Sequence, residues 1–118
     1  MDRGNAVTPR FPYLFVTVAV RDRSEELEAL VDTGFTGSLV VPTGFIGNGT
    51  PPDGYTVWRV ANGRRVRAPI YEGTVQIGDA EPLDATITVL GNQAILGREI
   101  TDHFRVIFDH GERVIVEP

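Results

Sequence analysis

Apolar and polar residues alternate along most of this chain with the two-residue period of β-strands. Residues 13–21 are mostly apolar or β-branched, and residues 26–31 alternate acidic with apolar side chains. The first segment predicts a strand, and the second predicts the strand that pairs with it in a hairpin. Similar patterns predict further strands at residues 55–61, 64–68, 72–77, 83–90, 105–109 and 113–117.

Turn signals separate these segments. Asn62-Gly63 stands between two extended segments, which is the strongest short-range signal for a hairpin with a two-residue turn. Residues 42–54 are rich in glycine and proline and predict a surface loop. Ile100 and Phe104 are four residues apart and therefore share a helical face.

One domain is expected from this pattern. Residues 98–104 predict a single short helix in an otherwise all-β fold that spans residues 13–118. Residues 1–12 are polar and contain two prolines, so we expect them to form a flexible arm. A chain of 118 residues is long enough for one hydrophobic core.

Composition narrows the possible functions. The hydrophobic content of 42% is ordinary for a globular protein, and no apolar run approaches the ~18 residues of a membrane span. The net charge of −5 argues against a nucleic-acid partner, which would require a basic surface. The chain has no cysteine and no secretory signal pattern, and we expect a cytoplasmic protein without a membrane partner.

The most informative segment runs from Leu30 to Pro42 and reads LVDTGFTGSLVVP. Asp32 stands where an apolar strand ends and a glycine-rich turn begins. Its carboxylate can therefore be held by backbone N–H groups and still face a cleft, because Gly34 and Gly37 permit close approach of the backbone. A bare Asp-x-Gly is more often a simple turn, but the apolar strands on both sides favour a catalytic loop.

A second motif follows downstream. Ala94-Ile95-Leu96-Gly97 is an apolar stretch that ends at a glycine and precedes the predicted helix. The two motifs together resemble those of the aspartic proteases, and most closely those of the small retropepsin-like proteins of bacteria and archaea, where phenylalanine follows Asp-Thr-Gly. The resemblance implies a retropepsin-like barrel or sandwich in which the strand Ile95-Leu96-Gly97 passes behind the catalytic loop.

The same resemblance assigns roles to the loop. Asp32 would be the catalytic acid, Thr33 would lock two copies of the loop together, and Gly34 would donate its N–H to the carboxylate. Hydrolysis of this kind needs two carboxylates that share one proton across a water. Only one Asp-Thr-Gly occurs in the chain, so we expect a homodimer that cleaves polypeptide substrates as an aspartic endopeptidase.

The Asn62-Gly63 hairpin occupies the place of the flap that closes over substrate in retropepsin-like enzymes. Ala61 and Arg64 complete its expected tip. The hairpin carries four arginines, for which two interpretations have equal weight: a solvated outer face, or a preference for acidic substrate residues. These arginines are Arg59, Arg64, Arg65 and Arg67.

Phe35 also has two possible roles, since it either walls the specificity pocket or crowds the cleft. Thr36 stands where viral enzymes have an acid, so Arg98 is expected to find another carboxylate. His103 and His110 lack partners at ligand spacing, and we expect no metal and no cofactor. The alternative hypothesis is a dimeric peptide-binding or regulatory module of the same fold with weak or no hydrolysis.

Overall fold

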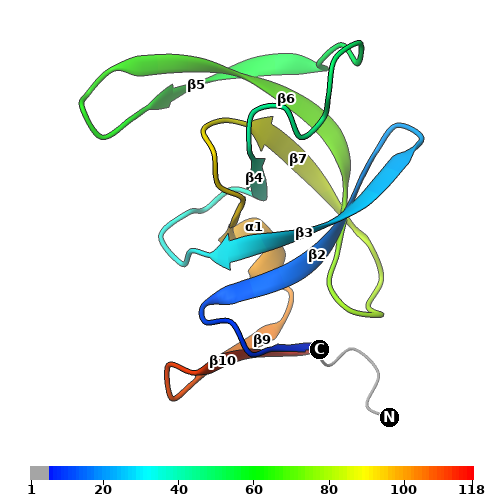
Figure 1. Ribbon diagram of the computed structural model, residues 1–118, viewed down its shortest axis with the longest axis vertical. Coiled ribbons are helices and arrows are strands. Elements are labelled where there is room, and N and C mark those ends of the chain that lie inside the picture. Colours follow the sequence, from blue (N-terminus) through cyan, green and yellow to red (C-terminus); the bar gives the residue numbers. More distant parts are fainter. Residues whose placement is uncertain (1–5) are drawn as a thin grey trace.

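Ten strands and one short helix make up residues 6–118, the part of the chain that the computed structural model describes (Figure 1). The elements are β1 (Ala6–Thr8), β2 (Tyr13–Val20), β3 (Arg23–Val31), β4 (Leu39–Val41), β5 (Gly54–Arg59), β6 (Arg65–Gln76), β7 (Leu83–Val89), β8 (Ile95–Leu96), α1 (Arg98–Thr101), β9 (Arg105–Asp109) and β10 (Arg113–Glu117). The all-β prediction with one short helix is confirmed. No helix in this part of the chain has the length and apolar character to cross a membrane.

The larger sheet closes into a barrel. Its strand order is β2-β3-β8-β4-β7-β6-β5, and an additional pairing of β2 with β6 joins the two sides. The β3–β8 and β4–β7 pairs are parallel, whereas the other pairs in this sheet are antiparallel. Strand β5 lies outside the closed ring, so the β5–β6 hairpin projects from one end of the barrel (Figure 1).

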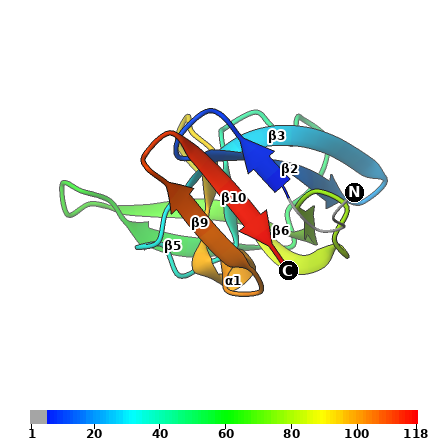
Figure 2. The same ribbon diagram turned by 90° about the horizontal axis from the view of Figure 1, so that it is seen from below.

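A three-stranded sheet of order β1-β10-β9 lies across the opposite end (Figures 1 and 2). Ala6 pairs with Val116, and Thr8 pairs with Val114. The prediction of a flexible arm is therefore wrong for residues 6–8. They form a strand because β10, which is distant in sequence, offers them a free edge. Residues 1–5 of that arm lie outside the described residues.

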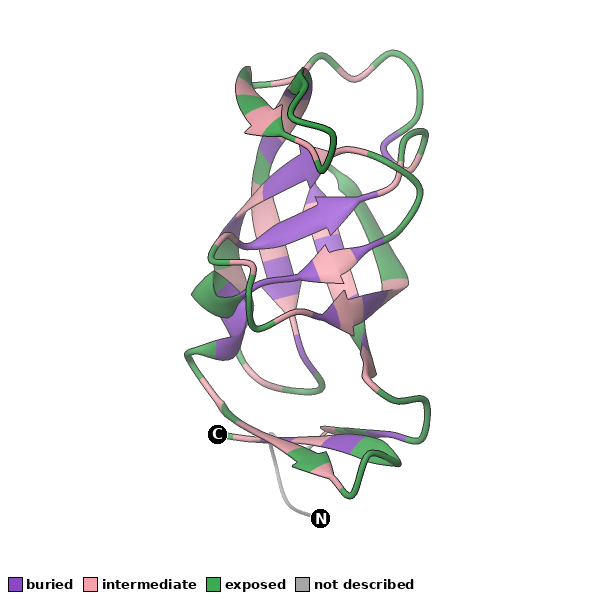
Figure 3. Cartoon of the chain, turned by 90° about the vertical axis from the view of Figure 1, so that its left-hand side faces the viewer, coloured by how far each residue is buried: buried purple, intermediate pink, exposed green. Residues whose placement is uncertain are grey.

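The core follows from the alternation in the sequence. Leu14, Val16, Val18 and Val20 of β2 face inward and are each at most 5% exposed. All three residues of β4 are buried because this strand lies between β7 and β8 in the middle of the sheet. Figure 3 shows the buried stretches running along the barrel strands.

The hairpin tip and strand β6 differ from the prediction. The tip is a three-residue loop rather than a two-residue turn: the N–H of Val60 donates to the carbonyl of Arg64 at 2.9 Å, and Gly63 adopts φ 82°. This geometry is a turn followed by a glycine in the left-handed region. The two strands expected at residues 64–68 and 72–77 form the single strand β6, which bends from the hairpin into the barrel.

The helix is shorter than predicted. It ends at Thr101 rather than at Phe104, and its last residues continue as turns in which His103 N–H donates to Ile100 and Phe104 N–H donates to Thr101. Phe104 still packs against the core from this turn. Ile100 and Phe104 therefore both face the core as predicted, although the backbone between them is not helical throughout.

Candidate active site

The loop between β3 and β4 presents the carboxylate of Asp32. The backbone N–H of Asp32 donates to the carbonyl of Leu96 at 3.1 Å, and the N–H of Phe35 donates to the carbonyl of Asp32 at 3.2 Å. The N–H of Gly34 donates to Asp32 Oδ1 at 2.8 Å, as the resemblance to the aspartic proteases implied. Asp32 itself is half-buried, so a fixed carboxylate remains accessible to solvent.

The second motif supports this loop from behind. Strand β8 lies between β3 and β4, pairing Ile95 with Leu30 and Leu96 with Leu39. At Gly97 the two segments come so close that a Cβ there would lie 2.1 Å from the carbonyl oxygen of Gly37. Only glycine permits this approach.

Hydrogen bonds then join the two motifs beyond the strands. The N–H of Gly97 donates to the carbonyl of Ser38 at 2.8 Å, and the N–H of Arg98 donates to that of Phe35 at 2.8 Å. Glu99 N–H donates to the carbonyl of Gly37 at 3.1 Å. The structure therefore holds together the motifs that the sequence separates by about 60 residues.

Phe35 forms one wall of a pocket beneath the β5–β6 hairpin. Its ring centroid lies 5.4 Å from that of Trp58, and the ring covers Gly37 and Gly97. The pocket has a volume of about 190 Å³. Its lining comes from the loop, the hairpin, β7 and α1, and consists of Phe35, Gly37, Ser38, Thr56, Trp58, Ile70, Thr86, Thr88 and Glu99.

The expected flap tip lies apart from this pocket. Ala61, Asn62, Gly63 and Arg64 form the exposed end of the hairpin, where Asn62 Oδ1 accepts from the N–H of Arg64 at 2.9 Å. The hairpin contributes Thr56 and Trp58 to the pocket instead. The predicted hairpin is present, and its inner face rather than its tip lines this pocket.

Three of the four hairpin arginines lie on the other face. Thr56 and Trp58 line the pocket, and side chains alternate along a strand, so Arg59 points away from it. Arg65 and Arg67 share that outer face, because they pair with Arg59 and Val57. The solvated outer face is thus the interpretation that the structure favours.

A second hollow, of about 300 Å³, lies on the side of Asp32 that faces β9. It is lined by Val31, Thr33, Arg98, Thr101, Asp102, Val106 and Phe108. Thr33 is exposed there. The carboxylate partner expected for Arg98 is Asp102, whose Oδ2 lies 3.3 Å from Arg98 Nη2.

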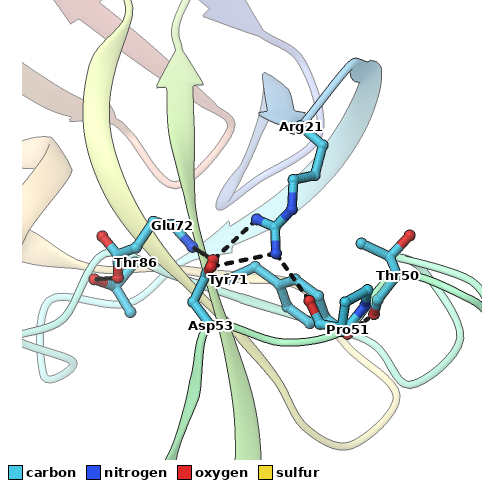
Figure 4. A network of polar contacts seen from close by, with 7 residues as sticks. All are labelled: Arg21, Thr50, Pro51, Asp53, Tyr71, Glu72 and Thr86. Atoms are coloured by element: carbon cyan, nitrogen blue, oxygen red, sulfur yellow. Dashed lines mark hydrogen bonds and ion pairs between the residues drawn. The ribbon is translucent and has the colours of Figure 1, made fainter.

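A polar network fixes the base of the hairpin (Figure 4). The guanidinium of Arg21 binds both carboxylate oxygens of Asp53 at 3.0 and 3.2 Å, and the backbone N–H of Glu72 donates to Asp53 at 2.8 Å. These contacts, the Glu72 N–H first and Arg21 second, hold the pKa of Asp53 below its usual range. Tyr71 adds a hydrogen bond from its hydroxyl to the carbonyl of Thr50 at 2.9 Å.

Sequence reasoning missed the residues that surround the pocket on its polar side. Ser38 is 3% exposed, and its hydroxyl donates to Glu99 Oε1 at 3.0 Å. Thr86 and Glu72 continue this group on β7 and β6. No spacing signal joins residues so far apart in the chain, so the sequence offered no way to find them.

A metal centre finds no support in the described residues, where no group of three or more His, Asp and Glu side chains could hold an ion. His110 instead lies 2.6 Å from Asp109, an exposed contact in the β9–β10 turn. Together with Arg113, whose contact is the larger cause, His110 keeps the pKa of Asp109 below its usual range.

Comparison with known proteins finds similarity in structure alone. No family model matches the chain, and no curated protein matches its sequence. Among solved structures, the crystal structure of a retropepsin-like aspartic protease from Rickettsia conorii matches with a TM-score of 0.60 at 16% identity. The match covers 96% of this chain and 90% of that chain. The fold is retropepsin-like.

Proposed function

We propose that the protein is an aspartic endopeptidase that acts as a homodimer, with Asp32 of each copy forming the catalytic pair. The observation that carries the proposal is the Asp32 carboxylate, held by the Gly34 N–H at 2.8 Å and still accessible, within a retropepsin-like fold. A carboxylate on a glycine-rich loop that is fixed from behind by a second motif is preorganised for chemistry rather than for structure.

Two such carboxylates provide the acid and the base for hydrolysis. Side by side they cannot both ionise, so they share one proton at working pH. The ionised carboxylate takes a proton from the water that lies between them, and the protonated one donates to the oxygen of the scissile carbonyl. The water oxygen bonds to the carbonyl carbon and gives a diol. The C–N bond then breaks as the nitrogen receives the proton that the first carboxylate took from the water, and a hydroxyl of the diol returns its proton to the second carboxylate.

The hollow beside Asp32 supports a two-fold contact between copies. Thr33 is exposed on its rim, next to the catalytic loop, and Phe108 contributes an exposed aromatic ring. Phe11 packs edge-on against Phe108 with 5.7 Å between ring centroids, which enlarges the apolar surface. An isologous interface on this face brings the two Asp32 loops to the symmetry axis.

The substrate would lie extended between the catalytic loop and the β5–β6 hairpin, which acts as the flap. The inner face of the hairpin lines the 190 Å³ pocket through Thr56 and Trp58, so a bound side chain would contact both the hairpin and the loop. Closure of such a lid excludes water and holds the substrate backbone by strand-like hydrogen bonds.

The test compares the wild type with Asp32→Asn. Asparagine keeps an oxygen that accepts from the Gly34 N–H, so the loop retains its main internal contact while losing the ionisable acid. Peptide-library cleavage is followed by mass spectrometry at acidic and neutral pH, and sedimentation equilibrium gives the oligomeric state. We expect both proteins to be dimers. The wild type should cleave peptides, and the variant should cleave them at least about 1,000-fold more slowly.

Equal cleavage by both proteins would refute the proposal, as would full activity in a monomer. If neither protein cleaves but both bind peptides, the fold serves as a peptide-binding module instead. The cleavage and binding results separate hydrolysis at Asp32 from hydrolysis elsewhere and from binding without hydrolysis, and the oligomeric state tests the dimer.

A further inference from the structure

The pocket under the β5–β6 hairpin has apolar walls and an acidic edge. Phe35 and Trp58 form one side with their rings, and Ile70 of β6 contributes an aliphatic surface. At about 190 Å³ the pocket has room for a long side chain but not for a whole peptide. The walls alone would accept any apolar group.

One carboxylate lines this pocket, and a second is bound to a residue that lines it. Glu99 lines it directly, and Glu99 Oε1 accepts from the hydroxyl of the buried Ser38 at 3.0 Å. Thr86 also lines the pocket, and its hydroxyl donates to Glu72 Oε1 at 3.0 Å (Figure 4). The N–H of Thr86 donates to Ser38 Oγ at 3.4 Å, which joins the two contacts into one chain.

This chain of hydrogen bonds orients both carboxylates. Each hydroxyl uses its single proton toward a carboxylate, so the acidic groups are positioned by donors that carry no charge. Each carboxylate keeps further acceptor sites for a donor that enters the pocket.

No described residue forms an ion pair with either carboxylate at this edge. Among residues 6–118, the ion pairs involve other carboxylates, and neither Glu72 nor Glu99 takes part in one. Arg98 is adjacent to Glu99 in sequence but binds Asp102, and the pocket lining contains no cationic residue. Both carboxylates are exposed and are therefore free to pair with a cation that enters the pocket.

We infer that this pocket binds a lysine or arginine side chain of the polypeptide substrate. Such a side chain combines an apolar stem with a cationic head, which matches the Phe35, Trp58 and Ile70 walls and the acidic edge. The aromatic faces also attract a cation. The inference rests on the proposed function, since it names the substrate class of the same groove.

Peptide libraries that are identical except at one position test this inference. That position carries lysine, arginine, norleucine or glutamate, and it is moved along the peptide in successive libraries. Norleucine matches the lysine stem without its charge. The proteins are wild type, the double variant Glu72→Gln/Glu99→Gln, and Glu112→Gln, an exposed acid in the β9–β10 turn. Glutamine keeps the oxygens that accept from Ser38 and Thr86.

Two quantities are measured at pH 6. The first is the kcat/KM for lysine peptides divided by that for norleucine peptides. The second is the affinity for lysine peptides divided by that for norleucine peptides, determined by fluorescence anisotropy on proteins that also carry Asp32→Asn. At one peptide position we expect both ratios to be about tenfold or more, because the pair is charge-assisted. The double variant should bring both ratios near one, and Glu112→Gln should leave them unchanged.

The outcomes distinguish this inference from the proposed function. If the wild type cleaves but lysine is no better than norleucine at any position, or if the preference survives in the double variant, the inference is refuted and the endopeptidase stands. If the wild type does not cleave, the hydrolytic proposal fails and affinity alone decides. Binding that favours lysine peptides and depends on Glu72 and Glu99 then supports the inference. Equal binding of lysine and norleucine peptides, or no binding, refutes it.

Discussion

Gly97→Ala is the sharpest test of how the loop that carries Asp32 is supported. Gly97 has φ −104° and ψ 177°, a conformation that alanine adopts freely, so the substitution introduces no backbone strain of its own. The added Cβ would lie 2.1 Å from the carbonyl oxygen of Gly37 and 2.6 Å from Cδ2 of Phe35. The effect of the substitution is therefore entirely one of contact.

The magnitude follows from what has to move. The Phe35 ring can rotate, but the Gly37 carbonyl accepts from the N–H of Glu99 at 3.1 Å and cannot withdraw without weakening that bond. Overpacking of this kind costs about 1–3 kcal/mol, and a weakened hydrogen bond adds about 1 kcal/mol. We expect Gly97→Ala to lower the free energy of unfolding by about 3 kcal/mol.

Urea unfolding at one fixed protein concentration measures this loss, since a dimer unfolds in a concentration-dependent way. With an m-value of roughly 1.5 kcal/mol/M, about 3 kcal/mol lowers the midpoint by roughly 2 M. The matched control is Gly54→Ala, where the added Cβ would lie 3.6 Å from Ile70, an ordinary contact. This control should change the free energy of unfolding by less than about 0.5 kcal/mol.

Equal midpoints for Gly97→Ala and Gly54→Ala would refute the reasoning. Such a result would mean that the loop and β8 separate at little cost, so the close approach does not hold Asp32 in place. Cleavage by Gly97→Ala should fall together with stability, since the displaced loop carries Asp32, the proposed catalytic carboxylate.

Three further predictions concern other parts of the molecule. Asp53→Asn should lower the urea midpoint at pH 7. The difference from wild type should shrink as pH falls below about 3.9, because a carboxyl with a lowered pKa stabilises the fold only while it is ionised. A difference that does not depend on pH would contradict this prediction. Ser38→Ala should cost about 1–2 kcal/mol by removing the donor to Glu99, and an unchanged midpoint would disprove that role. Phe108→Asp should dissociate the proposed dimer in sedimentation equilibrium, whereas Phe15→Asp, at a similarly exposed ring, should not.

The strands were predictable where the alternation of residues is local. Residues 105–109 and 113–117 form β9 and β10 with the predicted bounds, and β2 begins at the predicted residue. Strand β1 escaped prediction because its three residues pair with β10 more than 100 positions away. The conformation of so short a segment depends on the strand with which it pairs, and its own sequence does not identify that strand.

The loop at Asp32 was predictable for a similar reason. The Gly34 N–H reaches the carboxylate two residues away, a local geometry that the resemblance to the aspartic proteases implied. Orientation of the hairpin face was not predictable, because the register that pairs Arg59 with Arg65 decides which side chains face the loop. A shift of one residue would have reversed every side.

The amino-acid sequence alone determined the β-rich pattern and the glycine-rich turn after Asp32, because periodicity and backbone freedom act over a few neighbouring residues. Only the tertiary structure decided that Ser38, Glu99 and Glu72 meet at one pocket, and that its walls come from Phe35 and Trp58. Barrel closure brings these residues together through pairings between distant strands, and no local pattern encodes which distant side chains those pairings place in contact.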